Sequence, residues 1–126
     1  MDMDQQAAVK ALREEWSEEA LWNCVVAFQG CRFWTYSGLA FQYRLKKGRN
    51  GDYTRELFID RRENSKSLAW SSIRMAFRAV REIGAVVDRP KALGDIRGVT
   101  YIYALFYRFG LIDVPEAVRQ TMEGTE

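Results

Sequence analysis

The chain has 126 residues, 48% of them hydrophobic and 29% charged, with a formal net charge of +2. This length suits one domain, and so apolar a composition with so small a net charge argues against intrinsic disorder. A membrane span needs about 18 consecutive apolar residues, and no stretch of the sequence approaches that length. The N-terminus begins with acidic residues and continues as an amphipathic segment, unlike a secretory signal. We therefore expect a cytoplasmic protein with a single domain over residues 1–126.

The residue types restrict the chemistry. Histidine is absent, which removes imidazole metal ligands and histidine-based catalysis. Cys24 and Cys31 have no CxxC spacing, so reduced, partly buried thiols are the favoured interpretation. A disulfide is an alternative. Zinc is a weaker one, because two thiolates without histidine leave its coordination shell unfilled.

Two helices are predicted at the N-terminus. Asp4 is expected to cap the first, which runs through about Glu14, and Ser17 to cap the second. The second helix is expected to end at Gly30, since glycine favours the left-handed conformation that closes a helix. Residues 1–31 carry two Lys/Arg against six Asp/Glu, a balance of −4.

Three antiparallel strands are predicted next, at residues 32–36, 39–47 and 53–61. The segment is rich in aromatic residues, and Ser37-Gly38 and Asn50-Gly51 are turn signals. Apolar and polar residues alternate in the second strand, so that one face should be packed and the other wet. If Arg44 and Lys46 project beside Glu56 and Asp60, that wet face is charge-paired.

Further helices follow the strands. Ser65 or Ser67 is expected to start a long helix ending at Gly84, with a core face made by Trp70, Ile73, Phe77 and Val80. Another helix is predicted near 96–109 before Gly110, and a short one after Pro115. The predicted fold is α+β: two N-terminal helices, a three-stranded antiparallel meander, then two major helices on one sheet face and a short C-terminal helix.

Signatures of catalysis are missing. The sequence contains no GxGxxG, P-loop or GxSxG motif. Four carboxylates could gather around magnesium, namely those of Asp60, Glu63, Asp88 and Asp95. Most of them have arginine neighbours in the sequence, which favours roles in salt bridges and helix caps. We expect a non-enzymatic protein with no metal site and no cofactor.

The basic middle of the chain is the candidate binding surface. Residues 44–97 carry 14 Lys/Arg against seven Asp/Glu, a balance of +7. The candidate residues lie at the Asn50-Gly51 turn, after the third strand and along one stripe of the long helix: Lys46, Lys47, Arg49, Arg61, Arg62, Lys66, Arg74, Arg78 and Arg81. Guanidinium groups match phosphate and carboxylate equally well. The arginine stripe of the long helix therefore either binds a polyanion or forms ion pairs with the acidic first helices within the fold.

Most of the 17 aromatic residues sit at core spacing. Trp34, Tyr36, Tyr53 and Tyr107 are the ones that the pattern does not place in the core. Exposed aromatic residues near arginine suit base stacking and protein interfaces alike, so they do not separate the two kinds of partner.

Two segments, SKSLAWSSIRMAF and GDIRGVTYIYALFYRFGLI, resemble parts of short uncharacterised proteins from Firmicutes and their phages or mobile elements. The likeness covers roughly residues 33–112 and implies no activity, because none is assigned to the proteins it resembles. It does imply a phage or mobile-element context, in which small proteins often bind DNA or block a host defence complex.

Two functions follow as hypotheses. In the first, the basic middle engages nucleic acid, or the nucleic-acid channel of a protein complex. In the second, the chain is a protein–protein inhibitor or adaptor, such as an anti-CRISPR-like blocker, that does not touch nucleic acid and acts through its acidic first helices.

Overall fold

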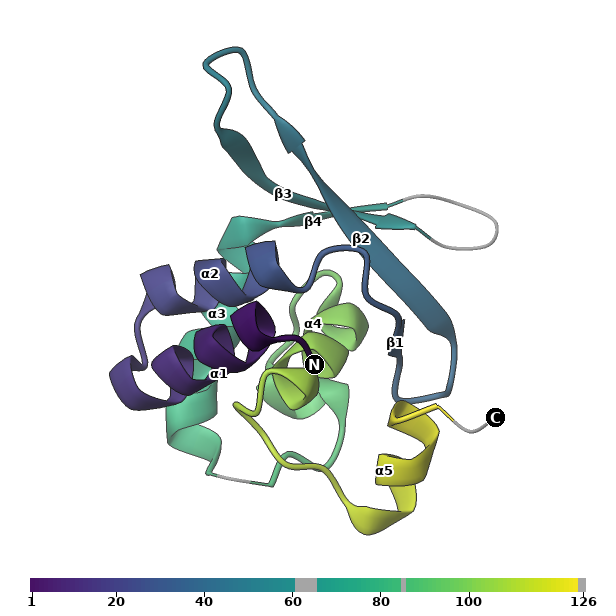
Figure 1. Ribbon diagram of the computed structural model, residues 1–126. Helices are drawn as coiled ribbons and strands as arrows, with labels where there is room; N and C mark the ends of the chain where they lie inside the picture. The colour runs from purple at the N-terminus through teal and green to yellow at the C-terminus, as the bar shows by residue number, and fades with distance from the viewer. Residues whose placement is uncertain (61–65, 85, 125–126) are drawn as a thin grey trace.

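The computed structural model describes residues 1–60, 66–84 and 86–124. Helices come first, an antiparallel sheet follows, and further helices close the chain (Figure 1). The α+β class predicted from the sequence is confirmed. In chain order the described elements are α1 Met3–Glu15, α2 Glu18–Ala27, β1 Phe33–Trp34, β2 Ala40–Lys47, β3 Tyr53–Asp60, β4 Lys66–Ala69, α3 Trp70–Ile83, the 3-10 helix η1 Pro90–Leu93, α4 Val99–Arg108 and α5 Glu116–Met122.

Local capping signals set the starts of the first two helices. Asp2, not Asp4, caps α1: its carboxylate accepts from the Gln5 backbone N–H at 2.8 Å, and Gln5 Oε1 accepts from the Asp2 N–H at 3.2 Å. The prediction of Asp4 was wrong because the residue three positions after it is Ala7, which cannot return the bond. Ser17 caps α2 as predicted, and α2 ends at Ala27, before the predicted stop at Gly30.

Within the described residues the sheet has four strands in the order β1-β2-β3-β4, and every neighbouring pair is antiparallel. The sequence predicted three. The fourth strand occupies residues that were expected to begin the long helix. Leu68 of β4 pairs with Leu57 of β3, and both side chains are buried. The predicted cap at Ser67 was therefore wrong, because Ser67 pairs with Phe58 of β3 and α3 begins after β4, at Trp70. The alternative cap, Ser65, lies outside the described residues.

Alternation along the strands separates the two faces of the sheet. Phe41, Tyr43 and Leu45 of β2 are buried, as are Leu57 and Ile59 of β3. The residues between those of β2 are exposed: Gln42, Arg44 and Lys46. The buried face adjoins α3 and α4, and the other face, the outer sheet face, carries the polar residues.

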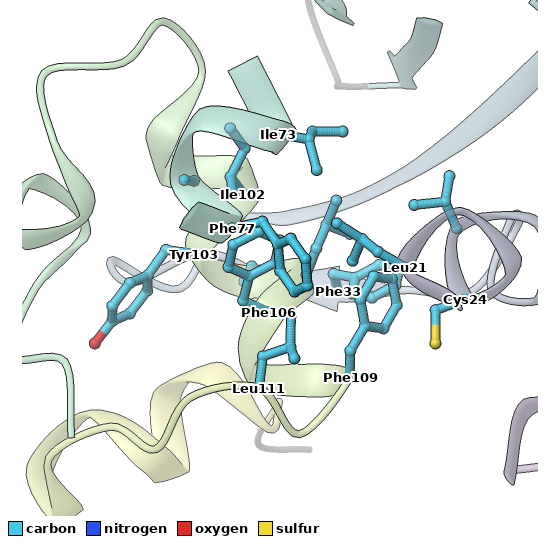
Figure 2. Packing of buried hydrophobic residues seen from close by; sticks show 14 of the residues in the cluster. Leu21, Cys24, Phe33, Ile73, Phe77, Ile102, Tyr103, Phe106, Phe109 and Leu111 are labelled. Carbon is cyan, nitrogen blue, oxygen red and sulfur yellow. The ribbon is translucent and has the colours of Figure 1, made fainter. Parts of the chain in front are cut away.

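The core joins the sheet to both groups of helices (Figure 2). Leu21 and Cys24 of α2 meet Phe77 of α3 and Phe106 of α4 in one buried cluster. The predicted core face of α3 is confirmed at three of its four positions, Trp70 being half-buried at its start.

A glycine stands just after the last residues of α3 and of α4. Gly84 ends α3, and α4 closes in a Schellman arrangement, with the Leu111 N–H donating to the Phe106 carbonyl at 2.9 Å. Gly110, at φ 78°, makes that ending possible, and the short helix α5 follows Pro115, both as predicted. None of the helices in the described residues combines the length and apolarity that crossing a membrane requires.

Candidate nucleic-acid interface

The hairpin formed by β2 and β3 extends past the helices, as Figure 1 shows at the top of the view. Its outer part, residues 44–55, is here called the arm. At the tip, the Gly48 N–H donates to the Asp52 carbonyl at 2.7 Å, and the Asp52 N–H donates to Asn50 Oδ1 at 3.1 Å. Gly51 has φ 86°, a conformation that glycine adopts without strain. The turn predicted at Asn50-Gly51 is confirmed.

The arm carries unneutralised positive charge. Its five Lys/Arg face a single acid, Asp52. Lys46, Lys47 and Arg49 are exposed, and within the described part of the chain none of the three makes an ion pair. Lys46 Nζ lies 4.2 Å from the centre of the Phe58 ring, and Lys47 Nζ lies 5.6 Å from that of Tyr53. These ring contacts orient the ammonium groups and leave their charge available to an anion.

The arginine stripe of α3 is arranged differently. Arg74 Nε lies 2.8 Å from Glu18 Oε1, and Arg78 Nη2 lies 3.5 Å from Glu18 Oε2. Arg81 donates to the Trp16 backbone carbonyl at 3.3 Å, and its guanidinium lies 5.8 Å from the Trp16 ring centre. The stripe thus ties α3 to the corner between α1 and α2. For Arg74 and Arg78 these contacts favour the alternative in which the stripe forms ion pairs with the acidic helices.

The remaining predicted site residues follow β3. Arg61 and Arg62 lie outside the described residues. Lys66 begins β4, where it is the register partner of Ile59. The structure therefore brings together Lys46, Lys47 and Arg49 on the arm, and separately Arg74, Arg78 and Arg81 on α3.

The outer sheet face is not charge-paired in the way that the sequence suggested. Arg44 pairs in register with Phe58, and the Asp60 carboxylate accepts from Gln42 Nε2 at 3.2 Å. A regular continuation of this register would place Lys46 opposite Glu56, but an irregularity between Leu45 and Lys47 interrupts it. Among the described residues, neither Arg44 nor Lys46 forms an ion pair.

Phe58 is the residue of this face that sequence reasoning missed. It is half-buried between Arg44 and Lys46, and a cleft of about 430 Å³ is lined by these three residues together with Leu45, Ile59 and Asp60. An uninterrupted apolar run such as Leu57-Phe58-Ile59 is typical of a strand centre covered on both sides. The strand alternation instead buries Leu57 and Ile59 and leaves Phe58 on the outer face.

Two further clefts lie away from the arm. One, of about 440 Å³, adjoins the arginine stripe and is lined by Trp16, Glu18, Phe77, Arg78, Arg81 and Glu82. The other, of about 640 Å³, is lined by Cys31, Arg32, Trp34, Tyr107, Arg108, Met122 and Glu123. In the second, Arg108 donates to the Arg32 carbonyl at 3.0 Å and the Tyr107 hydroxyl donates to Glu123, so polar groups of the wall are engaged with the protein itself.

The two cysteines are free thiols, as the sequence favoured. Burial raises the pKa of the Cys24 thiol from 9.0 to about 12, so this group stays neutral at pH values above 9, where an exposed thiol is ionised. Cys31 is half-buried, and its sulfur accepts a hydrogen bond from Gln5 Nε2 at 3.1 Å. Among the described residues, no three His, Cys, Asp or Glu side chains are grouped so that they could hold a metal ion.

Comparison of the chain with protein-family models, with curated proteins and with solved structures found no match.

Proposed function

We propose that the chain is a non-catalytic nucleic-acid-binding protein that uses the arm as its contact surface. The observation that carries this proposal is the exposed positive charge of Lys46, Lys47 and Arg49, which have no ion-pair partner among the described residues, on a hairpin that projects from the body. Phosphate backbones attract such charge regardless of sequence. A projecting hairpin can reach phosphates without displacing the packed core.

The paired stripe of α3 has a lesser part in this proposal. Glu18 offsets part of the charge of Arg74 and Arg78, and Arg81 is engaged with Trp16. A phosphate would have to compete with these internal partners. We therefore place primary binding on the arm and treat the stripe as a contact between helices.

The rival function, a protein–protein inhibitor or adaptor, relies on the acidic N-terminal helices as a surface that mimics nucleic acid. Two of their six carboxylates are engaged within the chain, Asp2 as a helix cap and Glu18 with two arginines. The remaining carboxylates are those of Asp4, Glu14, Glu15 and Glu19. Four negative charges are few for a surface that mimics nucleic acid. The arm is the better supported surface. The resemblance to phage and mobile-element proteins is compatible with either function.

The test is fluorescence anisotropy with a labelled single strand of about 12 nucleotides and the matching duplex, at about 20 mM and about 150 mM salt. The variant K46E/K47E/R49E reverses the charge of the arm. The control variant K10E/R89E/K91E has the same net charge, and its changes fall at exposed residues on α1 and at η1. Thermal melts of both variants establish that each is folded.

We expect wild type and the control variant to bind with Kd values of roughly 10⁻⁶ to 10⁻⁴ M near physiological salt, and more tightly at low salt. The arm variant should bind at least about tenfold more weakly. Its slope of log Kd against log salt should fall by about 0.7 for each phosphate of a single strand that the protein no longer neutralises. Wild type that binds neither probe at low salt would refute the proposal. Equal weakening in the arm and control variants would show a net-charge effect and would also refute it.

A further inference from the structure

At the base of the arm, the outer sheet face combines the Phe58 ring with two cations of the arm, Arg44 and Lys46. Phe58 lies on β3 at the centre of this face, with Arg44 as its register partner and Lys46 Nζ 4.2 Å from its ring centre. The cleft of about 430 Å³ at this point has Asp60 at its other end. Beyond the cleft toward the tip of the arm, the chain carries two further cations, Lys47, whose Nζ lies 5.6 Å from the Tyr53 ring centre, and Arg49.

Each feature fits one part of a single-stranded nucleic acid. An exposed aromatic face stacks with any base, and cations along its edge contact the phosphates on either side. Paired bases in a duplex are already stacked on their neighbours and do not offer their faces to a side chain. An aromatic ring beside cations that have no ion-pair partner in the described part of the chain therefore favours a single strand.

From these observations we infer that the outer sheet face is a single-stranded nucleic-acid site in which one base stacks on Phe58. Arg44 and Lys46 contact the flanking phosphates, and the strand continues along Lys47 and Arg49. This inference rests on the proposed function and assigns the class of nucleic acid that the same surface takes.

The position of Lys46 is consistent with an exchange on binding. In the free protein its ammonium group lies over the ring where the base would stack. Lys46 is exposed, and surface side chains change rotamer within nanoseconds. A base can therefore replace the ammonium group on the ring while the lysine moves to a phosphate. The Asp60 carboxylate repels phosphate. The bound nucleic acid therefore extends from the Phe58 ring toward the tip of the arm and away from Asp60.

The experiment separates stacking from charge by comparing two labelled strands of about 12 nucleotides, an oligo(dT) and an abasic strand that keeps the phosphates and lacks the bases. Wild type should bind oligo(dT) roughly 5- to 150-fold more tightly than the abasic strand, the range that one stacked base produces. An oligo(rU) strand measured beside them distinguishes a DNA site from an RNA site.

Phe58→Ala should bring the affinity for oligo(dT) down to that for the abasic strand and leave the affinity for the abasic strand unchanged. Phe58→Leu keeps apolar contacts and should behave like the alanine variant, whereas Phe58→Trp should retain the preference. Tyr36→Ala is the matched control, because Tyr36 is an exposed aromatic residue that precedes β2, at the end of that strand remote from the arm.

A preference for oligo(dT) that persists in Phe58→Ala, or no preference in wild type, would overturn this inference and leave the proposed function standing. Binding of the duplex alone would likewise overturn this inference and leave the proposed function standing. Failure of wild type to bind any of the strands or the duplex at low salt would instead remove the proposed function, and this inference with it. Thermal melts ensure that weaker binding is measured on folded protein.

Discussion

Phe77 and Arg78 are adjacent on α3 and occupy opposite environments, so substituting each one tests the orientation of the helix. The Phe77 side chain is 5% exposed, and its ring stacks on Trp16 with centroids 5.7 Å apart and meets the edge of Phe106 at 6.5 Å. Cutting a buried phenylalanine to alanine costs about 3–5 kcal/mol. For a domain of this size, that destabilisation lowers the Tm by about 10–20 °C.

Arg78→Glu should cost far less. The Arg78 side chain is 65% exposed and its contact with Glu18 is 3.5 Å long, so the pair is an exposed ion pair worth about 0–1 kcal/mol. The new carboxylate adds repulsion against Glu18 of a similar size. We therefore expect the Tm to fall by less than about 5 °C, and by less again at high salt, where charges are screened.

The assay is thermal unfolding followed by circular dichroism for wild type and both variants, at low and high salt. An Arg78→Glu variant that loses more stability than Phe77→Ala would overturn this orientation of α3. That result would mean that the arginine stripe is a buried ion-pair layer and that the apolar face of α3 is turned toward solvent.

Two further predictions concern Gly98 and Cys24. Gly98 has φ 77°, and a Cβ at this position would lie 2.5 Å from Leu68 Cδ1. Gly98→Ala should therefore lower the free energy of unfolding, measured by urea titration, by at least about 1–2 kcal/mol. Unchanged stability would contradict the close approach of Gly98 to β4. Because burial raises the pKa of Cys24 from 9.0 to about 12, its neutral thiol contributes stability below pH 9 that is lost as the pH rises toward 12. Urea titrations from pH 8 to 11 should show a fall steeper in wild type than in Cys24→Ala, by up to about 1.4 kcal/mol per pH unit, and parallel curves would contradict it.

Local chemistry determined much of the fold in advance. The Ser17 cap, the Asn50-Gly51 turn and the Gly110 ending each depend on a few neighbouring residues, and each could be read from the sequence. The alternation along residues 40–47 likewise assigned one buried and one exposed face. Such signals are local because the hydrogen bonds and side-chain directions involved are set within a few residues.

The binding surface depended on contacts between distant segments. The sequence offered three groups of basic residues, at the hairpin turn, after the third strand and along the long helix. Only the packing of α3 beside the start of α2 set Glu18 against Arg74 and Arg78. The tertiary structure thereby left the free charge on the arm. The strand at Lys66–Ala69 was missed for the same reason, because its pairing with β3 is decided by the partner strand and not by its own residues.

Strand register then decided the character of the outer sheet face. In the sequence, Phe58 stands between two core residues and looks like a third. Register sets it beside Arg44, and the irregularity between Leu45 and Lys47 interrupts the pairing that would have set Lys46 opposite Glu56. A one-residue change of register exchanges every neighbour across a sheet. The sequence by itself therefore determined that the middle of the chain would be basic. The tertiary structure decided which of its cations lack an ion-pair partner among the described residues, and which ring lies beside them.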